Sequence, residues 1–421
     1  MQVQKLVIKG GNALWGEILL RGAKNSALPI LAASLLCSGE TVLENCPRLT
    51  DVFAALRILT HTGCRCSFEE HTVTIHAENI VRSEIPEQLM QEMRSSIVFL
   101  GALLGRTGAC QVYYPGGCEL GPRPIDMHLD ALSKMGVCIQ RHEGRLDCTA
   151  PCGLKGARIH LRFPSVGATE NIMLAAVLAK GETVLCNAAR EPEICDLAEF
   201  LRRSGACISG DGESTIRIKG VKKLGGCAYR VMPDRIAGLT YLCAAAATGG
   251  TIRLRGTNGT EMENVLPVLE QSGCRVDRAE DSVYLHAPKR LKSCFRLKTM
   301  PHPGFPTDIQ PVIMAAMTTA EGTSVFEENI FENRYRHVDG LVQMGADICV
   351  SGRTAVVSGV KELYGAHAAA TDLRSGAALV VAGLCAAGTT EVRQICHIDR
   401  GYEKIEEVLK GAGADIARVQ Q

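Results

Sequence analysis

Hydrophobic and polar positions follow a pattern that recurs six times along the chain. Strand-like segments, in which apolar and polar residues alternate, follow Gly39, Gly108, Gly181, Gly250, Gly322 and Gly388, at spacings of 66 to 73 residues. A helical pattern then ends at a second glycine 23 to 28 residues after the first, as in LRILTHTGCRC, and another strand-like segment follows. Glycine at that position can take the left-handed conformation that ends a helix.

A second kind of helix precedes several of these units. The segments NSALPILAASLLC, NIMLAAVLAK, GLTYLCAAAATGG and SGAALVVAGLCAAG are apolar on nearly all sides and rich in small residues. A helix of this kind is buried on all sides. We therefore expect strand, helix, strand, helix units with the apolar helices at the centre and the sheets outside them. Gly and Pro cluster in GGCAYRVMPDRIAG, which predicts a break between units three and four.

Composition restricts the class of protein further. A chain of 421 residues predicts two domains of about 200 residues each. Lys plus Arg (46) and Asp plus Glu (45) nearly cancel, which argues against nucleic acid as a partner. The N-terminus has no basic-then-apolar signal segment, and no apolar run approaches the roughly 18 residues of a membrane span. We expect a cytoplasmic protein that does not use a membrane.

Cysteine is unusually frequent, with 19 residues. An odd number in a long chain without a signal segment indicates reduced thiols that serve mainly as core residues. Cys64 with Cys66, or Cys148 with Cys152, lacks the matching second pair of a zinc site. We expect no metal and no cofactor.

Two loops of the N-terminal half carry candidate chemistry. RGAKNSALP places Lys24 and Asn25 at the start of an apolar helix, where backbone N–H groups favour an anion. The alternative is a solvated lysine and a helix-capping asparagine. YYPGGCELGPRP places Cys118 in a Gly- and Pro-rich loop near Arg123. A thiol near a cation can act as a nucleophile or an acid, although most cysteines only pack.

Two further loops lie in the C-terminal half. PHPGFPTDIQP ends on Asp308, which could be a general base or could cap the following helix. HIDRGYEKIEE places Asp399 and Arg400 before a helix. They could belong to an anion-binding site or form an internal salt bridge. Lys24, Arg123 and Arg400 together with Cys118 and Asp308 predict an anion-binding site with one acid and one base, which is suited to transfer chemistry on a phosphorylated substrate.

Ten motifs in order make the chain resemble the UDP-N-acetylglucosamine 1-carboxyvinyltransferase family of enolpyruvyl transferases. They are GAKNSALPILAA, MRSSIVFLG, PGGCELGPRPIDMHL, PSVGATENIM, NAAREPEI, MPDRI, PHPGFPTDIQ, FENRYRHV, TDLRSGAALV and HIDRGYEKIE. The resemblance implies a two-domain inside-out α/β barrel of six βαβαββ repeats. The implied domains are residues 1–22 plus 233–421, with Asp308 and Arg400, and residues 23–232, with the Cys118 loop. The active site is implied to lie in the cleft between them.

The resemblance also implies an activity, the transfer of the enolpyruvyl group of phosphoenolpyruvate to the 3′-hydroxyl of UDP-N-acetylglucosamine with release of phosphate. In the family this is the first committed step of peptidoglycan synthesis. Lys24, Arg123 and Arg400 would hold phosphoenolpyruvate, with Asn25 beside them. Cys118 would protonate the methylene carbon, can form a covalent phospholactoyl adduct and is the thiol that fosfomycin alkylates. Asp308 would take the proton of the sugar hydroxyl.

The nucleotide sugar would meet a larger set of residues. These are Arg94 at the uridine, Arg123, Pro124, Ile125, Asp126 and Met127 at the uracil and ribose, Ser165, Val166 and Gly167 along the diphosphate, and Asp308 and Ile330 at the sugar and nucleotide. Asp372 and Arg374 would support the loop or the phosphoenolpyruvate site. Two departures from the family pattern stand out. Phe163 replaces a lysine that some members use for the diphosphate, and Ala237-Gly238-Leu239 shifts the glycine after MPDRI by one position.

Other readings lead to different activities. A shikimate-phosphate enolpyruvyl transferase would share the fold, but the Cys118 loop and the SVGAT motif speak against it. A non-catalytic paralogue that binds UDP-sugars would be favoured if Lys24, Cys118, Asp308 or Arg400 were missing, and all four are present. A repeat scaffold used only for structure needs no cysteine loop. The sequence leaves the oligomeric state open.

Overall fold

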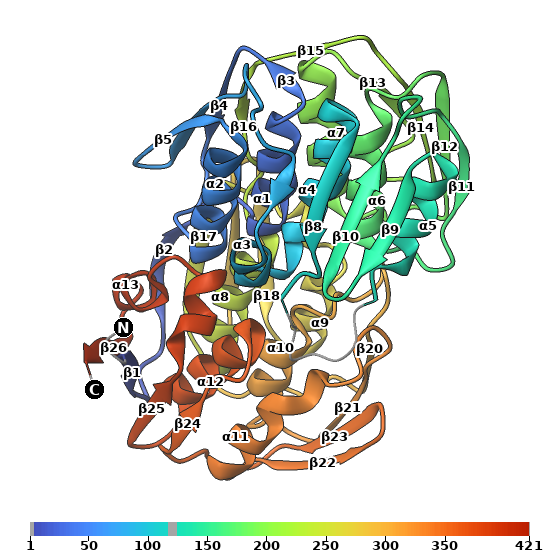
Figure 1. Cartoon of the computed structure of the whole chain (residues 1–421). Coiled ribbons are helices and arrows are strands. Elements are labelled where there is room, and N and C mark those ends of the chain that lie inside the picture. Colours follow the sequence, from blue (N-terminus) through green and yellow to red (C-terminus); the bar gives the residue numbers. More distant parts are fainter. Residues whose placement is uncertain (1–3, 117–123, 421) are drawn as a thin grey trace. The chain divides into compact units, whose positions relative to one another are not determined.

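The computed structural model describes residues 4–116 and 124–420 (Figure 1). Cys118 and Arg123 lie outside the described residues. The chain divides into two compact units. Their described residues are 22–116 with 124–232, here the central unit, and 4–21 with 233–420, here the terminal unit. Each unit has its own hydrophobic core.

Three apolar helices form the middle of the central unit, as the sequence predicts. They are α1 (Lys24–Ser34), α4 (Val98–Thr107) and α6 (Val166–Ala176), and they pack against one another. The outer helices are α2 (Thr50–Thr62), α3 (Glu87–Glu92), η1 (Arg94–Ile97), α5 (Asp126–Lys134) and α7 (Pro192–Arg203). In α1 every residue except Asn25 is buried, because the helix is surrounded by the rest of its unit.

Three four-stranded sheets belong to the central unit. In strand order they are β16 (Ala228–Arg230), β4 (Glu40–Glu44), β6 (Thr72–His76) and β5 (Arg65–Glu69); β7 (Glu84–Ile85), β8 (Ala109–Tyr113), β10 (Arg145–Thr149) and β9 (Cys138–His142); and β11 (Arg158–His160), β12 (Glu182–Cys186), β14 (Thr215–Lys219) and β13 (Cys207–Ser209). A two-stranded sheet joins β15 (Leu224–Gly225) to β3 (Cys37–Ser38). Each four-stranded sheet has one parallel edge strand beside an antiparallel set.

The terminal unit repeats this plan. Its inner helices are α8 (Arg235–Ala247), α10 (Gln310–Met317) and α12 (Leu373–Cys385). Its outer helices are η2 (Thr260–Met262), α9 (Leu266–Gln271), η3 (Arg334–His337), α11 (Val338–Gln343), η4 (Ile395–Arg400) and α13 (Ile405–Gly411). Two sheets are β18 (Arg275–Ala279), β19 (Ser282–His286), β17 (Thr251–Arg255) and β2 (Trp15–Leu19), and β20 (Arg296–Lys298), β21 (Thr323–Glu327), β23 (Thr354–Ser358) and β22 (Asp347–Ser351).

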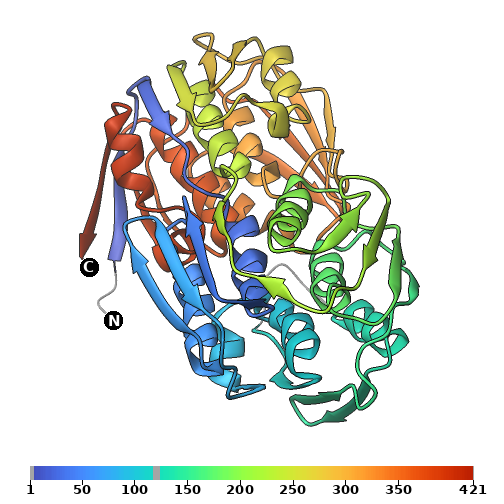
Figure 2. The same ribbon diagram turned by 90° about the horizontal axis from the view of Figure 1, so that it is seen from above.

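The third sheet of the terminal unit brings the two ends of the chain together. Its order is β24 (His367–Ala369), β25 (Thr389–Arg393), β1 (Gln4–Lys9) and β26 (Asp415–Gln420). β1 pairs antiparallel with both β25 and β26, and Figure 2 shows the first and last strands side by side. The N-terminal segment thus supplies the strand that this repeat would otherwise lack. The predicted architecture of six repeated βαβαββ units around inner helices is confirmed.

Glycine explains how each repeat turns. Gly63, which follows α2, has a φ of 112° and ends the helix in the left-handed conformation, as the sequence predicts. Gly250 precedes β17 for a different reason, since a Cβ there would lie 2.2 Å from the backbone oxygen of Leu14. The strand can therefore start there only if no side chain is present.

The thiols behave as the composition predicts. All 18 cysteines in the described part of the chain are free, and eight of them are buried. Burial raises the pKa of the Cys64 thiol to about 11, so it remains protonated and packs as a small apolar side chain. Within the described ranges, no helix is long and apolar enough to cross a membrane.

Candidate functional site

Asp308 lies in the terminal unit between two buried arginines. Its Oδ1 accepts a hydrogen bond from Arg334 at 2.9 Å, and its Oδ2 accepts two from Arg374, at 3.1 and 3.3 Å. Both guanidinium groups are almost fully buried, whereas the Asp308 side chain is 30% exposed. Ile309 is the N-cap residue of α10, so the helix-capping alternative for Asp308 is wrong. The arginines fix the carboxylate while leaving it accessible.

Arg334 is a residue that the sequence reasoning missed. Its guanidinium also donates two hydrogen bonds to the Thr307 carbonyl, at 2.8 and 3.0 Å. It therefore holds the backbone and the side chain of the Asp308 loop together. FENRYRHV contains Arg334 and was recognised as a family motif, but the motif alone does not show which of its charged residues points inward.

Asp372 and Arg374 belong to the first turn of α12 and form a support for the same loop. Asp372 is the N-cap and accepts hydrogen bonds from the backbone N–H groups of Arg374 and Ser375. Burial alone would raise the pKa of Asp372, but the charge of Arg334 and the hydrogen bonds from Ser375 outweigh burial and lower it. Arg374 also donates to the Tyr402 hydroxyl at 3.0 Å. The supporting role expected of Asp372 and Arg374 agrees with this geometry.

Arg400 and Ile330 complete the residues expected from this unit. Arg400 ends η4, a short helix that packs against α12, and is half-buried. Its neighbour Asp399 accepts two hydrogen bonds from Arg418, at 2.7 and 2.9 Å, so Asp399 takes the predicted salt-bridge alternative. Ile330 is half-buried, and its N–H donates to Glu328 at 2.8 Å.

Lys24 is the first residue of α1 in the central unit and is buried rather than solvated. Its Nζ lies 2.7 Å from Oδ2 of Asp51, a buried residue in the first turn of α2. Ala23, not Asn25, is the N-cap of α1, so the capping alternative for Asn25 is wrong. Asn25 is exposed next to Lys24. The Asp51 carboxylate offsets the charge of this ammonium, so the attraction for an anion here comes also from the backbone N–H groups at the start of α1.

Ser165, Val166 and Gly167 form the start of α6. Ser165 is the N-cap, and its hydroxyl accepts from the Ala168 N–H at 3.3 Å. All three expected residues are half-buried, and α6 is 11 residues long, so its unpaired N–H groups can contact an anion. Phe163, which replaces the family lysine, is 41% exposed and offers no positive charge there.

Four residues expected at the uridine line one small pocket. Arg94, Pro124, Ile125 and Asp126 enclose a space of about 210 Å³ together with Tyr114, Leu129 and Arg141. Arg162 forms an ion pair with Asp126. Met127 lies in α5 and packs against the core, outside that lining. Sequence reasoning missed Tyr114, Arg141 and Arg162, because only the fold brings these parts of the chain to one place.

His128 is buried in α5, the helix that also carries Asp126 and Leu129 of the pocket lining. Its Nδ1 lies 2.9 Å from the amide nitrogen of Asn171, and its ring is next to Gly167. Burial, and then the charge of Arg94, lowers the pKa of His128 to about 4. The ring is therefore neutral near pH 7 and accepts the hydrogen bond from Asn171.

The departure at Ala237-Gly238-Leu239 has a packing explanation. These residues lie inside α8, and a Cβ on Gly238 would lie 2.7 Å from Cε of Met262 and 2.9 Å from Cδ1 of Leu20. The glycine therefore lets α8 pack closely against η2 and the N-terminal segment. No group of three or more His, Cys, Asp or Glu side chains in the described residues is arranged to hold a metal ion.

The fold and these residues define the class of carboxyvinyl transferases. The family model described as EPSP synthase (3-phosphoshikimate 1-carboxyvinyltransferase) matches residues 8–409. The solved structure of the enolpyruvyl transferase NikO from Streptomyces tendae is similar, with a TM-score of 0.90, 26% identity and full coverage of both chains. EPSP synthase from Acinetobacter baumannii has a TM-score of 0.77 at 22% identity over 99% of this chain and 100% of its own, which shows a shared fold.

Curated relatives identify the family within this class of transferases. The chain is 49% identical to UDP-N-acetylglucosamine 1-carboxyvinyltransferase 2 of Caldanaerobacter subterraneus subsp. tengcongensis, over 99% of both chains. It is 47% identical to UDP-N-acetylglucosamine 1-carboxyvinyltransferase of Trichlorobacter lovleyi, over the full length of both. The chain therefore belongs to the UDP-N-acetylglucosamine 1-carboxyvinyltransferase family.

Proposed function

We propose that this chain transfers the enolpyruvyl group of phosphoenolpyruvate to the 3′-hydroxyl of UDP-N-acetylglucosamine and releases phosphate. The observation that carries the proposal is the full-length identity of 46 to 49% to relatives that bear this name. In a bacterial cell this reaction would be the first committed step of peptidoglycan synthesis. The enzyme would act in the cytoplasm and would affect cell-wall growth, cell shape and division.

The proposed reaction uses one acid and one base. Asp308 accepts the proton of the 3′-hydroxyl, whose oxygen attacks C2 of phosphoenolpyruvate, while Cys118 delivers a proton to the C3 methylene. The tetrahedral intermediate then loses a proton from C3 and expels phosphate, which leaves the enol ether. Hydrogen bonds from Arg334 to one oxygen of Asp308 and from Arg374 to the other favour the ionised carboxylate, which is the form that a base needs.

Positive groups would bind phosphoenolpyruvate. Lys24, Arg123 and Arg400 offset its phosphate and carboxylate, with Asn25 next to Lys24, and they stabilise charge that moves during the reaction. Because Lys24 belongs to the central unit and Arg400 to the terminal unit, we propose that the active site takes residues from both. We propose that residues 1–22 plus 233–421 and residues 23–232 act as the two domains.

The nucleotide sugar would occupy the surroundings of the small pocket. Arg94, Pro124, Ile125 and Asp126 line that pocket, and Arg123 and Met127 adjoin them in sequence. Ser165, Val166 and Gly167 would meet the diphosphate through the N-terminus of α6. Ile330 would touch the nucleotide, and Asp372 and Arg374 would hold Asp308 in place. The reaction needs no metal or other cofactor.

The deciding experiment measures phosphate release from phosphoenolpyruvate with UDP-N-acetylglucosamine and, in parallel, with shikimate 3-phosphate. Release only with the nucleotide sugar is expected. Release only with shikimate 3-phosphate would overturn the substrate, and release with neither, despite tight UDP-sugar binding, would favour a non-catalytic paralogue. Asp308→Ala should abolish turnover while UDP-N-acetylglucosamine binding stays measurable, and near-normal turnover would exclude Asp308 as the base.

A further inference from the structure

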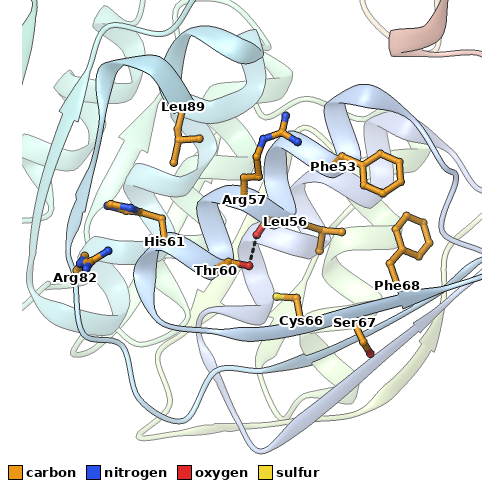
Figure 3. A pocket seen from close by; sticks show the side chains of 10 residues that line it. All are labelled: Phe53, Leu56, Arg57, Thr60, His61, Cys66, Ser67, Phe68, Arg82 and Leu89. Carbon is orange, nitrogen blue, oxygen red and sulfur yellow. Dashed lines mark hydrogen bonds between the residues drawn. The ribbon is translucent and has the colours of Figure 1, made fainter.

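A larger pocket lies in the central unit and contains none of the residues expected to bind the substrates. It has a volume of about 600 Å³ and lies between α2, β5 and the segment around α3 (Figure 3). Its lining residues are Phe53, Leu56, Arg57, Thr60, His61, Cys66, Ser67, Phe68, Arg82 and Leu89. This volume is in the range of pockets that hold small molecules.

One end of this pocket is apolar and aromatic. Phe53 and Phe68 lie with their ring centroids 5.3 Å apart, and Figure 3 shows both rings at the same end. The guanidinium of Arg48 lies 4.6 Å from the centroid of the Phe68 ring, which holds that ring in place. Leu56 extends the same apolar surface. A planar hydrocarbon body can pack against these side chains.

The opposite end is cationic. Arg82 and His61 lie close together there in Figure 3, and Arg57 lies on the same helix as His61. Glu92 neutralises Arg57 with hydrogen bonds to its guanidinium. Arg82, in contrast, is exposed to solvent, its side chain has no ion-pair or hydrogen-bond partner among the described residues, and no acid is among the lining residues. The charge that lacks a counterpart is therefore that of Arg82.

His61 adds a second unsatisfied group. Its Nε2 is shielded from solvent and has no hydrogen-bond partner within the part of the chain described. A shielded polar atom without a partner is unfavourable, and a ligand group that bonds it would remove that cost. Burial raises the pKa of the Cys66 thiol to about 12, so this cysteine is not a nucleophile and binding here is non-covalent.

We propose that this pocket binds a small molecule with a flat apolar body and one anionic group. The body packs on Phe53, Leu56 and Phe68, and the anion pairs with Arg82 beside His61. The proposal does not depend on the proposed reaction, because none of the lining residues is assigned to it. α2 joins the two regions, since it carries both the pocket face and Asp51, the partner of Lys24.

The test uses 2-naphthoate as the probe and 2-naphthamide as its neutral counterpart. Binding to the full chain is measured by calorimetry and by methyl chemical shifts of Leu56 and Leu89, with saturating UDP-N-acetylglucosamine present to occupy the nucleotide-sugar site. We expect 2-naphthoate to bind with a millimolar or lower Kd and to shift both methyl groups. The amide should bind about two- to fivefold more weakly, because it cannot form the ion pair with the exposed Arg82.

Two arginine variants make the test specific. Arg82→Gln should weaken 2-naphthoate about two- to fivefold, the loss of an exposed ion pair. Arg65→Gln is the matched control, because Arg65 is an exposed arginine on β5 outside the lining, and it should leave the Kd unchanged. Absence of methyl shifts, equal binding of the amide, or equal effects of the two variants would each overturn the proposal. Failure of phosphate release would not affect it.

Discussion

Asp308 is held by two guanidinium groups that differ in what else they bind. Arg374 also contacts Tyr402, which in turn bonds Thr240 at 2.8 Å, so it links the loop to α8. Arg334 bonds the loop, lies 3.9 Å from Asp372 and packs over the Phe331 ring, 5.6 Å from its centroid. We therefore interpret Arg334 as a positioning residue, which sets the direction of the Asp308 carboxylate without itself exchanging a proton.

Arg334→Met tests this interpretation. Turnover should fall at least about tenfold with little change in the KM of UDP-N-acetylglucosamine, because the base is misdirected while the nucleotide-binding residues stay in place. The free energy of unfolding should fall by about 3 kcal/mol, since buried and half-buried carboxylates lose a partner. Steady-state kinetics and urea unfolding measure the two effects.

Matched variants separate position from charge. Arg334→Lys keeps the charge but cannot supply the same set of hydrogen bonds, so it should restore stability better than turnover. Arg336→Met removes an exposed arginine from the same short helix and should change neither quantity much. Equal losses in Arg334→Met and Arg336→Met would contradict a positioning role.

Cys118 gives a second prediction at the level of one side chain. Cys118→Asp should retain turnover, because a carboxylic acid can also deliver a proton, but it should resist fosfomycin, because no thiol remains to be alkylated. Phosphate release after incubation with the drug measures both. Cys152→Asp, at a cysteine that is exposed in the structure, should stay sensitive. Continued inactivation of Cys118→Asp would refute the assignment.

The helix N-termini show how a short element creates an anion site. Ser165 caps the start of α6, and its neighbours Val166 and Gly167 are half-buried. In the turn before α6, Phe163 stands where some family members have a lysine, so this positive charge is missing. Arg162, the preceding residue, is directed instead to Asp126. The diphosphate would therefore depend mainly on backbone N–H groups here.

Phe163→Lys should strengthen binding at this turn. We expect the Kd of UDP-N-acetylglucosamine to fall by up to about fivefold, equivalent to ~1 kcal/mol for an exposed ion pair, and the gain should shrink at high salt. Calorimetry at two ionic strengths measures the change. Phe295→Lys is the control, because Phe295 is 89% exposed and lies in the terminal unit. A gain that is the same in both variants, or independent of salt, would rule out a local contact.

Local signals predicted most of the elements. The second glycine of each repeat ends a helix because its left-handed conformation is a property of one residue, and the Ala-rich helices are buried because their composition leaves no polar face. The site was predicted through motifs. The sequence did not predict the roles of Arg334, Tyr402 and Arg141. These roles depend on which neighbouring element each side chain faces, and no pattern within one segment contains that information.

At the scale of the whole molecule, each unit contains one buried neutral histidine. His128 lies in the central unit, and His337 lies in the terminal unit, where its Nε2 is 3.2 Å from the Met314 sulfur. Burial lowers the pKa of each to about 4; at His337 the charge of Asp372 opposes this and that of Arg334 assists it. Both pKa values lie below the ordinary value of 6.5.

The sign of the pH effect follows from these pKa values. Above pH 6.5 the histidines are neutral in the folded and the unfolded chain and contribute no pH dependence. Between pH 6.5 and about 4 the unfolded chain binds protons that the folded chain does not, so the free energy of unfolding falls as the pH falls. Each histidine contributes a slope of about 1.4 kcal/mol per pH unit in that window.

The variant His128→Gln isolates one of these contributions. Glutamine can still accept a hydrogen bond from Asn171, but it does not titrate. Burial raises the pKa of Asp196 and Glu170, so these two acids make the free energy of unfolding change with pH in the opposite direction. The contribution of His128 is therefore measured by comparing the variant with the unmodified chain. Urea unfolding at pH 7 and pH 5 should show that His128→Gln loses less stability than the unmodified chain, by about 2 kcal/mol. The exposed His286 is the control position. Equal losses of unfolding free energy in the unmodified chain and in His128→Gln would mean that His128 is not neutral in the folded state.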